Sequence, residues 1–200
     1  MKLEHLNRED TAEAVDALCS AFADYSVMRY VLADSGADYD DHLRALIGFF
    51  CNKRLVRGWP VVGVRVDARL AAVALISEPG AAAAPPELET LRADLANHIG
   101  KAAWKRLQRY EAESDLDAPE APHHFLGVIG VRPENQGQGL ARILLEELAR
   151  MSERHPESTG VCLNTESADN VRFYEHMGYR VLGHRTVDAL ETWCMFRPNA

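Results

Sequence analysis

The chain has 200 residues, of which 47% are hydrophobic and 26% are charged, and its formal net charge is -8. This composition fits one globular domain over residues 1–200, and the acidic balance argues against nucleic-acid partners, because binding to phosphate backbones needs a surplus of Lys and Arg. No apolar stretch approaches the roughly 18 residues of a membrane span, and the first residues lack an apolar signal-peptide core. We therefore expect a cytoplasmic protein without membrane partners.

Hydrophobic periodicity divides the first half of the chain into helices and a hairpin. Asp10 or Thr11 can cap the first helix, and Gly100 is expected to interrupt the last one. Two apolar runs flank Asp67 and Ala68 at the spacing of a β-hairpin. In chain order, the expected elements are a strand over residues 2–7, a helix ending near residue 22, a helix over 38–56, hairpin strands over 58–66 and 70–78, a loop over 78–87 and a helix over 87–113.

The second half alternates strands and helices more regularly. A clear apolar face predicts the helix over 140–151, and Gly178 is expected to end the helix that follows it. In chain order, the expected elements are a loop over 114–124, a strand over 125–131, a helix over 140–151, a strand over 160–165, a helix over 168–177 and strands over 179–187 and 191–197. Hairpins together with strand–helix–strand units predict a mixed α/β (α+β) fold.

Cysteine usage points to a reducing compartment. The four cysteines lie far apart, and no two of them form a C-x-x-C pair. Such spacing argues against both a disulfide framework and a metal site. We expect reduced thiols scattered through the core and no metal; the four residues are Cys19, Cys51, Cys162 and Cys194.

The stretch "VRPENQGQGLA", residues 131–141, leads from a strand through a glycine-rich turn into a helix. The first N–H groups of a helix have no partner inside it and carry the positive end of its dipole. Gly137 and Gly139 allow the chain to curl so that consecutive N–H groups face one concavity, with no Cβ in the way of a ligand. A phosphate or pyrophosphate is the natural occupant of such a turn.

Three phosphate-binding patterns compete for this turn, beside the alternative that it binds nothing. The P-loop requires Lys-Ser or Lys-Thr after the glycines, and the dinucleotide fingerprint requires a third glycine where Arg142 stands. The third pattern, [Q/R]-x-x-G-x-[G/A], is met by Gln136, Gly139 and Ala141. It resembles the acetyl-CoA pyrophosphate loop of the GCN5-related N-acetyltransferase (GNAT) superfamily.

A second motif strengthens this resemblance. "NVRFYEHMGYRVL", residues 170–182, is similar to the family's other hallmark, in which an Asn is followed by [FL]-Y-E-x-x-G-[FY]. The resemblance implies the GNAT fold, a mixed central sheet of about six or seven strands flanked by helices. It also implies that Asn170 contacts the coenzyme and that Tyr174 lies near its sulfur. The implied coenzyme-binding residues are Ile129, Gly130, Val131, Gln136, Gly137, Gln138, Gly139, Leu140, Ala141, Arg142 and Asn170.

A narrower resemblance concerns one group within the superfamily. "AFADY" (21–25), "QGQGL" (136–140), "NVRFYEHMGY" (170–179) and "TWCM" (192–195) are together similar to puromycin N-acetyltransferase and its relatives. This resemblance implies an aminonucleoside-type antibiotic or another amine metabolite as acceptor, and antibiotic resistance as one candidate role. At one point the chain departs from the group: Asn164 stands where we align a Glu, and Glu166 follows two residues later on the same strand face.

The chemistry of amine acetylation selects the candidate catalytic residues. An alkylamine with a pKa of about 10.4 is almost fully protonated at neutral pH, so a base or a water chain must remove a proton. The departing thiolate benefits from a proton donor, and the resemblance supports Tyr174 as this general acid. His124 and Glu166 are the candidate bases; a structural histidine and a helix-capping Glu are the alternatives.

The remaining predictions concern binding. By family analogy, a backbone N–H of the strand over 125–131 polarises the thioester carbonyl, and Gly130 permits a close approach or a bulge there. Tyr25, Tyr30 and Asn164 are expected to border the acceptor. The predicted function is transfer of acetyl from acetyl-CoA to a primary amine of a small molecule by a monomer or homodimer. A non-catalytic acyl-CoA-binding regulatory domain and an enzyme acting on a protein or peptide amine are the alternatives.

Overall fold

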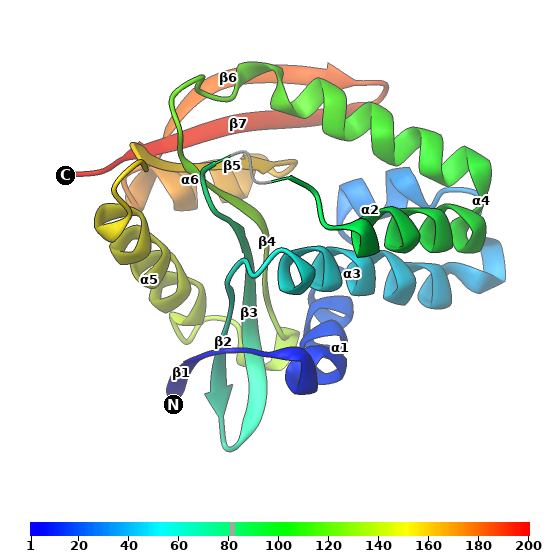
Figure 1. Ribbon diagram of the computed structural model, residues 1–200, viewed down its shortest axis with the longest axis horizontal. Coiled ribbons are helices and arrows are strands. Elements are labelled where there is room, and N and C mark those ends of the chain that lie inside the picture. The colour runs from blue at the N-terminus through cyan, green and yellow to red at the C-terminus, as the bar shows by residue number, and fades with distance from the viewer. Residues whose placement is uncertain (81–82) are drawn as a thin grey trace.

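The computed structural model describes residues 1–80 and 83–200, and its framework is a seven-stranded mixed sheet with the strand order β1-β2-β3-β4-β5-β7-β6 (Figure 1). Neighbouring strands are antiparallel except β4 and β5, which are parallel. The predicted fold class is therefore confirmed. The strands are β1 (Lys2–His5), β2 (Val61–Val66), β3 (Arg69–Ser77), β4 (His124–Val131), β5 (Gly160–Thr165), β6 (Arg180–Val187) and β7 (Leu190–Pro198).

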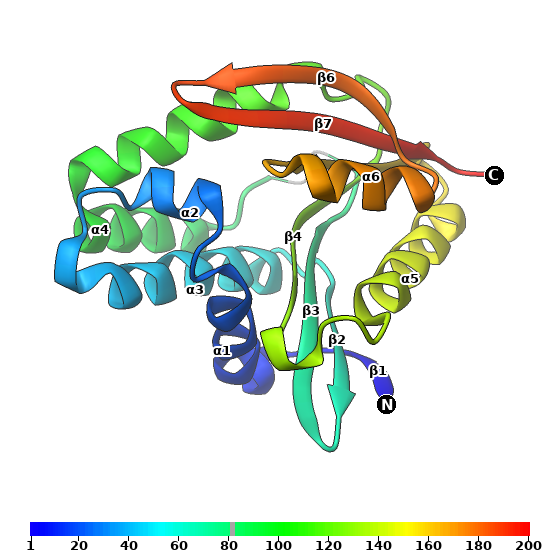
Figure 2. The same ribbon diagram turned by 180° about the vertical axis from the view of Figure 1, so that it is seen from behind.

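Helices cover both faces of the sheet. The helices α1, α3 and α4 lie on one side of it and α5 lies on the other, as the two opposite views show (Figures 1 and 2). The helices are α1 (Thr11–Phe22), α2 (Ser26–Val31), α3 (Tyr39–Val56), α4 (Pro86–Ser114), α5 (Leu140–Arg154) and α6 (Ala168–His176). Helix α2 was not predicted, because six residues are too few to show a helical period. Part of the predicted loop over 78–87 lies outside the described residues.

Backbone conformation confirms three predictions that rested on turn chemistry. Asp67 and Ala68 both have positive φ, 48° and 66°, as a two-residue type I′ hairpin turn requires. Gly100 interrupts α4 with φ 81° and ψ 161°. Gly178 follows α6 with φ 87°, and its N–H donates to the carbonyl of Glu175.

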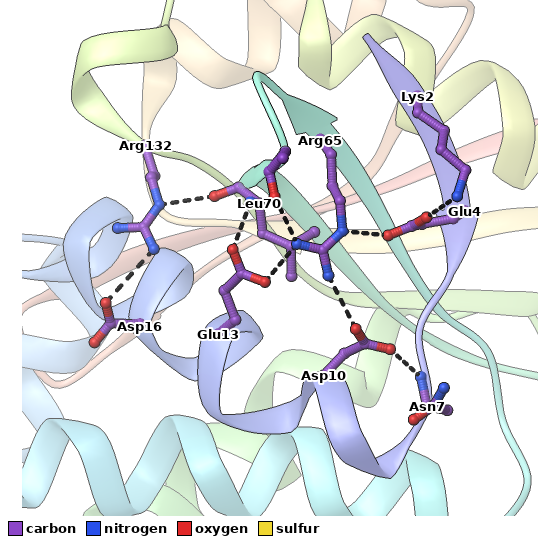
Figure 3. A network of polar contacts seen from close by, with 10 residues as sticks. Lys2, Glu4, Asn7, Asp10, Glu13, Asp16, Arg65, Leu70 and Arg132 are labelled. Atoms are coloured by element: carbon purple, nitrogen blue, oxygen red, sulfur yellow. Dashed lines mark hydrogen bonds and ion pairs between the residues drawn. The ribbon is translucent and has the colours of Figure 1, made fainter.

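The start of α1 differs from the prediction. Asp10 occupies the N-cap position, but its carboxylate does not cap α1. Instead it accepts hydrogen bonds from the N–H of Asn7, at 3.0 Å, and from Nη2 of Arg65, at 2.9 Å. Arg65 also donates to Glu4 and Glu13, so one guanidinium ties β1 and α1 to the hairpin (Figure 3). The Asp10 carboxylate binds Arg65 of β2 and therefore does not cap α1.

The parallel pair β4–β5 is short, and this creates the space for a site. The two strands pair only over 124–126 and 161–163, so β4 has no neighbour on that side beyond Leu126 within the described part of the sheet. On its other side β4 contains a bulge: Leu126 pairs with Ile76 and Val128 with Leu75, which leaves Gly127 as the extra residue.

Gly130 was expected to permit either a close approach or a bulge, and the bulge is not at this residue. It pairs regularly with Val73 of β3, so it is not the bulged residue. A Cβ there would lie 2.9 Å from side-chain atoms of Ala21 and Leu18. The close approach that this glycine permits is that of helix α1 to the strand.

Buried apolar side chains form a core on each side of the sheet. On one side α1 and α3 pack against β3, with α2 and α4 adding to the same core, and on the other α5 packs against β2 to β5. Leu140, Leu144 and Leu148 of α5 are each at most 1% exposed, and each such burial contributes about 1.5–3 kcal/mol. The start of α5, and the glycine turn before it, are thereby fixed to the core. Among the helices that the structure describes, none has the length and apolar character needed to cross a bilayer.

All four cysteines are free thiols, as predicted. Cys51, Cys162 and Cys194 are buried, and Cys19 is half-buried. The sulfur atoms of Cys162 and Cys194 lie 3.6 Å apart on the neighbouring strands β5 and β7. The sequence separation of these two cysteines had given no sign of this proximity.

Candidate active site

A groove of about 1020 Å³ follows the glycine-rich turn between β4 and α5. After the short 3-10 helix η4 (Pro133–Asn135), Gly137 and Gly139 adopt φ values of 75° and 78°. These left-handed conformations favour glycine, and no atom lies within 4 Å of where a Cβ would stand on either residue. The groove is lined by every residue predicted to bind the coenzyme: Ile129, Gly130, Val131, Gln136, Gly137, Gln138, Gly139, Leu140, Ala141, Arg142 and Asn170.

The electrostatic character of this groove suits an anion. The N-terminal end of α5 faces it and offers unpaired N–H groups at the positive end of the helix dipole. The first turn of α5 carries no acidic residue and includes Arg142. A cation there opposes the helix dipole, which costs helix stability, but both cation and dipole attract a phosphate. The residues present therefore fit a pyrophosphate.

A second hollow, a cavity of about 300 Å³, adjoins the groove. Its walls come from helices α1 to α4, from β4 and from the end of β5, with α6 at one side. The cavity and the groove share five lining residues, so the two spaces meet. The shared residues are Phe22, Tyr25, Ile129, Glu166 and Asn170.

Glu166 follows directly after β5 at this junction. Its carboxylate accepts hydrogen bonds from the hydroxyl of Tyr110 and, at 3.1 Å, from Oγ1 of Thr192. Burial raises the pKa of the Glu166 carboxyl, although the hydrogen bonds from Tyr110 and Thr192 oppose that rise. The side chain does not cap α6, whose N-cap residue is Ser167. Glu166 is thus a half-buried acid whose proton affinity is raised where the two spaces meet.

Tyr174 lies on α6 and is 6% exposed, and it lines the cavity. Burial raises the pKa of its phenol, and nearby Tyr25 adds to the rise, so the hydroxyl stays protonated at neutral pH. Tyr25 itself hydrogen-bonds Oγ1 of Thr165 at 3.3 Å and accepts from the N–H of Glu166 at 3.1 Å. The structure therefore gathers Tyr25, Glu166 and Tyr174 around one end of the cavity.

Asn164 and Tyr30 were also predicted to border the acceptor, but only Asn164 lines the cavity. Asn164 on β5 lines the cavity, and its Nδ2 lies 3.5 Å from Oδ1 of Asp115. Tyr30 lines neither the cavity nor the groove. Its hydroxyl donates to Asp188, in the turn between β6 and β7, at 2.7 Å.

His124, at the start of β4, also lies apart from these spaces. Nδ1 of His124 lies 2.9 Å from Oγ of Ser158, and the ring meets His155 edge to face at 5.4 Å. Burial lowers the pKa of His124 to about 4, so the imidazole is neutral at pH 7. It lines neither the cavity nor the groove, and the structure does not bring it together with Glu166 and Tyr174.

Several polar residues of the cavity wall were not found in the sequence. Tyr110 is half-buried on α4, where its spacing from Leu107 is that of any core aromatic. The charged residues come from helices α3 and α4 and the short 3-10 helix η3 (Asp115–Asp117) after α4, and no motif surrounds them in the sequence. They are Lys53, Arg54, Glu111 and Asp115.

One group of metal-ligating side chains occurs within residues 1–80 and 83–200. Ligand atoms of Asp41, His42 and His98 all lie within 4.8 Å of one another. Asp41 and His98 are already paired, at 2.7 Å, and both are exposed. The group lies on α3 and α4 and belongs to neither the cavity nor the groove.

Three features of the structure fit a site for acyl transfer. They are the short parallel strand pair in the sheet, the turn that suits a pyrophosphate, and the polar cavity beside it. Residues 94–181 match the family model described as "Acetyltransferase (GNAT) domain", a range that includes both sequence motifs and the strand between them. The part of the chain that carries the two motifs is therefore similar to GNAT acetyltransferases, as the motifs had indicated.

Several solved structures share the fold of this chain. A Corynebacterium glutamicum structure described as "histone acetyltransferase HPA2 and related acetyltransferase" is 20% identical, with a TM-score of 0.74 over 100% of this chain and 96% of that one. Arylalkylamine N-acetyltransferase 2 of Aedes aegypti is 15% identical, with a TM-score of 0.66 and 100% and 99% covered. The ribosomal-protein-S18-alanine N-acetyltransferase of Escherichia coli is 18% identical, with a TM-score of 0.60 and 100% and 94% covered.

Proposed function

We propose that this protein transfers the acetyl group of acetyl-CoA to a primary amine of a small molecule. The match of residues 94–181 to the GNAT acetyltransferase domain supports acyl-CoA-dependent N-acetyltransferase activity in general. The observation that carries the finer proposal is the junction of groove and cavity at Glu166 and Asn170, with Tyr174 in the cavity wall. A thioester held in the groove and an amine held in the cavity would meet there.

Binding of the coenzyme rests on backbone groups. The turn over 136–141 would hold the pyrophosphate through its N–H groups, and Asn170 would contact the coenzyme beside the junction. Beyond Leu126 the edge of β4 that faces β5 has no strand partner in the described sheet. An N–H of this edge near Ile129 is free to polarise the thioester carbonyl.

The chemical step needs one proton acceptor and one proton donor. The amine loses a proton to Glu166, directly or through a water, and its nitrogen attacks the carbonyl carbon. As the carbon–sulfur bond breaks, the hydroxyl of Tyr174 protonates the departing thiolate. The nitrogen then gives its second proton to the Tyr174 phenolate, directly or through a water, and becomes the amide nitrogen, while Glu166 releases its proton to solvent. The raised pKa of Glu166 makes it a better base, and the raised pKa of Tyr174 keeps its proton in place until sulfur leaves.

The dimensions of the cavity favour a small acceptor over a protein. Its volume of about 300 Å³ lies between four helices and the sheet, and apolar side chains such as Val31, Leu46 and Leu107 line it. The likeness to puromycin N-acetyltransferase keeps aminonucleosides among the candidate acceptors. Asn164 lines the cavity where that group is aligned with a Glu, so the acceptor need not be the same.

A thiol-release assay tests the proposal. Acetyl-CoA is incubated with the protein and a panel of amines that includes alkylamines, arylalkylamines, amino acids, aminonucleosides and short peptides. We expect at least one small amine to raise thiol release well above background. Release only with peptides would show a protein or peptide acetyltransferase instead. Tight coenzyme binding without release on any amine would show a non-catalytic acyl-CoA-binding domain.

A further inference from the structure

A buried arginine in the cavity wall has no carboxylate of the described residues within ion-pair distance, although the charge of Glu111 is near enough to raise its pKa slightly against the effect of burial. Arg54, in the last turn of α3, is 4% exposed and lines the cavity. Its Nη1 donates to the carbonyl of Phe50 at 3.4 Å, while its Nε has no hydrogen-bond partner. No carboxylate of the described residues forms an ion pair with it within 4.0 Å. Burial lowers the pKa of this guanidinium to about 10, so it is still charged at pH 7.

The other buried arginine shows how such a charge is ordinarily accommodated. Arg132 is 3% exposed, and its Nε donates to the carbonyl of Leu70 at 2.8 Å. Its Nη2 lies 3.6 Å from the carboxylate of Asp16 (Figure 3). A buried charge without a counterion is costly, because burial removes the water that would solvate it. Arg54 has the same burial as Arg132 but lacks the carboxylate.

The acids in the cavity are already engaged with other groups. Glu166 accepts from Tyr110 and Thr192. Glu111 has Lys53 at 3.9 Å, and Asp115 has Asn164 at 3.5 Å. Each acid in the cavity lining therefore has a polar partner in the wall, and Arg54 is left as a cation facing the hollow.

The bulge in β4 places this cation at a defined distance from the junction. A Cβ at Gly127 would lie 2.0 Å from Nη2 of Arg54, so the guanidinium rests against the strand at this glycine. Gly127 is itself exposed to the cavity. Ile129, two residues along β4, lines both cavity and groove, and two residues of a strand span about 6.6 Å.

We propose that the acceptor is a primary amine that also carries a carboxylate, and that Arg54 binds this carboxylate. The inference rests on the proposed function, which puts the amine at the junction. The separation along β4 then calls for several bonds between nitrogen and carboxylate, as in a short ω-amino acid. A guanidinium suits this role because its donors match the two oxygens of a carboxylate.

The test compares ω-amino acids with their own primary amides, which have the same length but no charge. The series runs from 3-aminopropanoate to 6-aminohexanoate, each with its amide, and the readout is the ratio of the two kcat/KM values. We expect the wild type to prefer at least one acid, and Arg54→Met to lower that preference about tenfold or more, the range of a charge-assisted hydrogen bond.

A matched control lies on the same helix. The guanidinium of Arg44 is exposed and pairs with Asp16 at 2.7 Å outside the cavity, so Arg44→Met should keep the wild-type preference. If Arg54→Met fails to fold, Gly127→Ala gives a second variant, because its methyl group displaces the guanidinium. A wild-type enzyme that acetylates acids and amides equally, or an unchanged preference in folded Arg54→Met, overturns the inference.

Calorimetry separates this inference from the proposed function. Binding of 4-aminobutanoate and of its amide is measured without acetyl-CoA in the wild type and in Arg54→Met. Turnover of amines without any Arg54-dependent preference would contradict the carboxylate site and leave the acetyltransferase intact. Binding of 4-aminobutanoate that depends on Arg54, with no turnover of any amine, would support the site and contradict the enzyme.

Discussion

The groove and the cavity meet at five residues, yet they are built in different ways. The longest continuous part of the groove lining is residues 135–142, where Gly137 and Gly139 keep the backbone groups proposed to bind the coenzyme open. The cavity is assembled from residues of five helices and three strands that are up to about 150 residues apart in the sequence. A space that binds through backbone geometry needs particular residue types at fixed spacing, and a space that binds through side chains needs only the fold.

This difference explains why the groove could be recognised completely from the sequence and the cavity only in part. Every predicted coenzyme residue lines the groove, whereas Tyr30 and His124 lie outside both spaces. The comparison also assigns tasks: the groove should govern affinity for acetyl-CoA, and the cavity should govern the acceptor and the chemistry. Variants in the groove and in the cavity test whether coenzyme affinity and catalysis can be changed separately.

The largest effect is expected for Tyr174→Phe. Loss of the hydroxyl removes the proposed proton donor, so kcat should fall on the order of 100-fold or more, with little change in the KM for acetyl-CoA. Steady-state kinetics with the best amine of the panel checks this. Tyr179→Phe is the control, since Tyr179 is buried beside Tyr174 at 5.6 Å but lines neither space. Equal losses in both variants would contradict the assignment.

The next effect concerns the groove. Gly139→Val places a β-branched residue at a φ of 78°, which strains the turn, so the KM for acetyl-CoA should rise about tenfold or more. Gly36→Val is the matched control, because Gly36 has a φ of 53° with no atom near its Cβ position and lies far from the groove in the chain. Both variants should lose stability, but only the first should lose coenzyme affinity. A similar KM in both would refute the role of the turn.

A smaller effect is expected in the pH dependence of stability at the junction. Burial raises the pKa of Glu166 above its usual 4.5, so between that value and the raised pKa the folded state binds more protons than the unfolded state. Folding stability therefore falls as the pH rises through this window. Glu166→Gln should remove this loss, and urea unfolding across pH 4 to 8 measures it. A steeper loss in the variant would show that the carboxylate stabilises the fold.

The smallest effect on catalysis is expected outside both spaces. The pKa of His124 is about 4 in the folded protein against 6.5 ordinarily, so the unfolded state binds more protons between these values. Stability should rise with pH across this window, and His124→Gln should flatten the rise. Urea midpoints report the slope. If kcat falls in this variant as far as in Tyr174→Phe, then His124 acts in catalysis.

The fold was largely accessible from the sequence because it depends on period and turn chemistry. The long helices, the hairpin at Asp67 and the break at Gly100 follow from local patterns. Helix α2 and the bulge at Gly127 were missed, since a six-residue helix and one extra strand residue leave no periodic signal. Both border the cavity, so the least predictable part of the fold coincides with the least predictable part of the site.

In the candidate site, too, residues that belong to a sequence pattern could be predicted and isolated side chains could not. Tyr174 and Asn170 lie in a motif, and Glu166 was found because it lies two residues after Asn164, where the narrower resemblance aligns a Glu. Arg54 could not be found, because an arginine in the last turn of a helix usually serves the helix dipole in solvent. Only the packing of α3 against β4 shows that this arginine is buried beside a hollow.

A bisubstrate conjugate tests most directly the central claim that groove and cavity are two halves of one site. The amine with the highest kcat/KM in the thiol-release assay is joined through an acetyl linker to the sulfur of CoA, and its affinity is measured by calorimetry. If the two spaces meet at Glu166 and Asn170, the conjugate should bind about 100-fold more tightly than CoA, because its second half binds at a high effective concentration. An affinity equal to that of CoA would contradict the account.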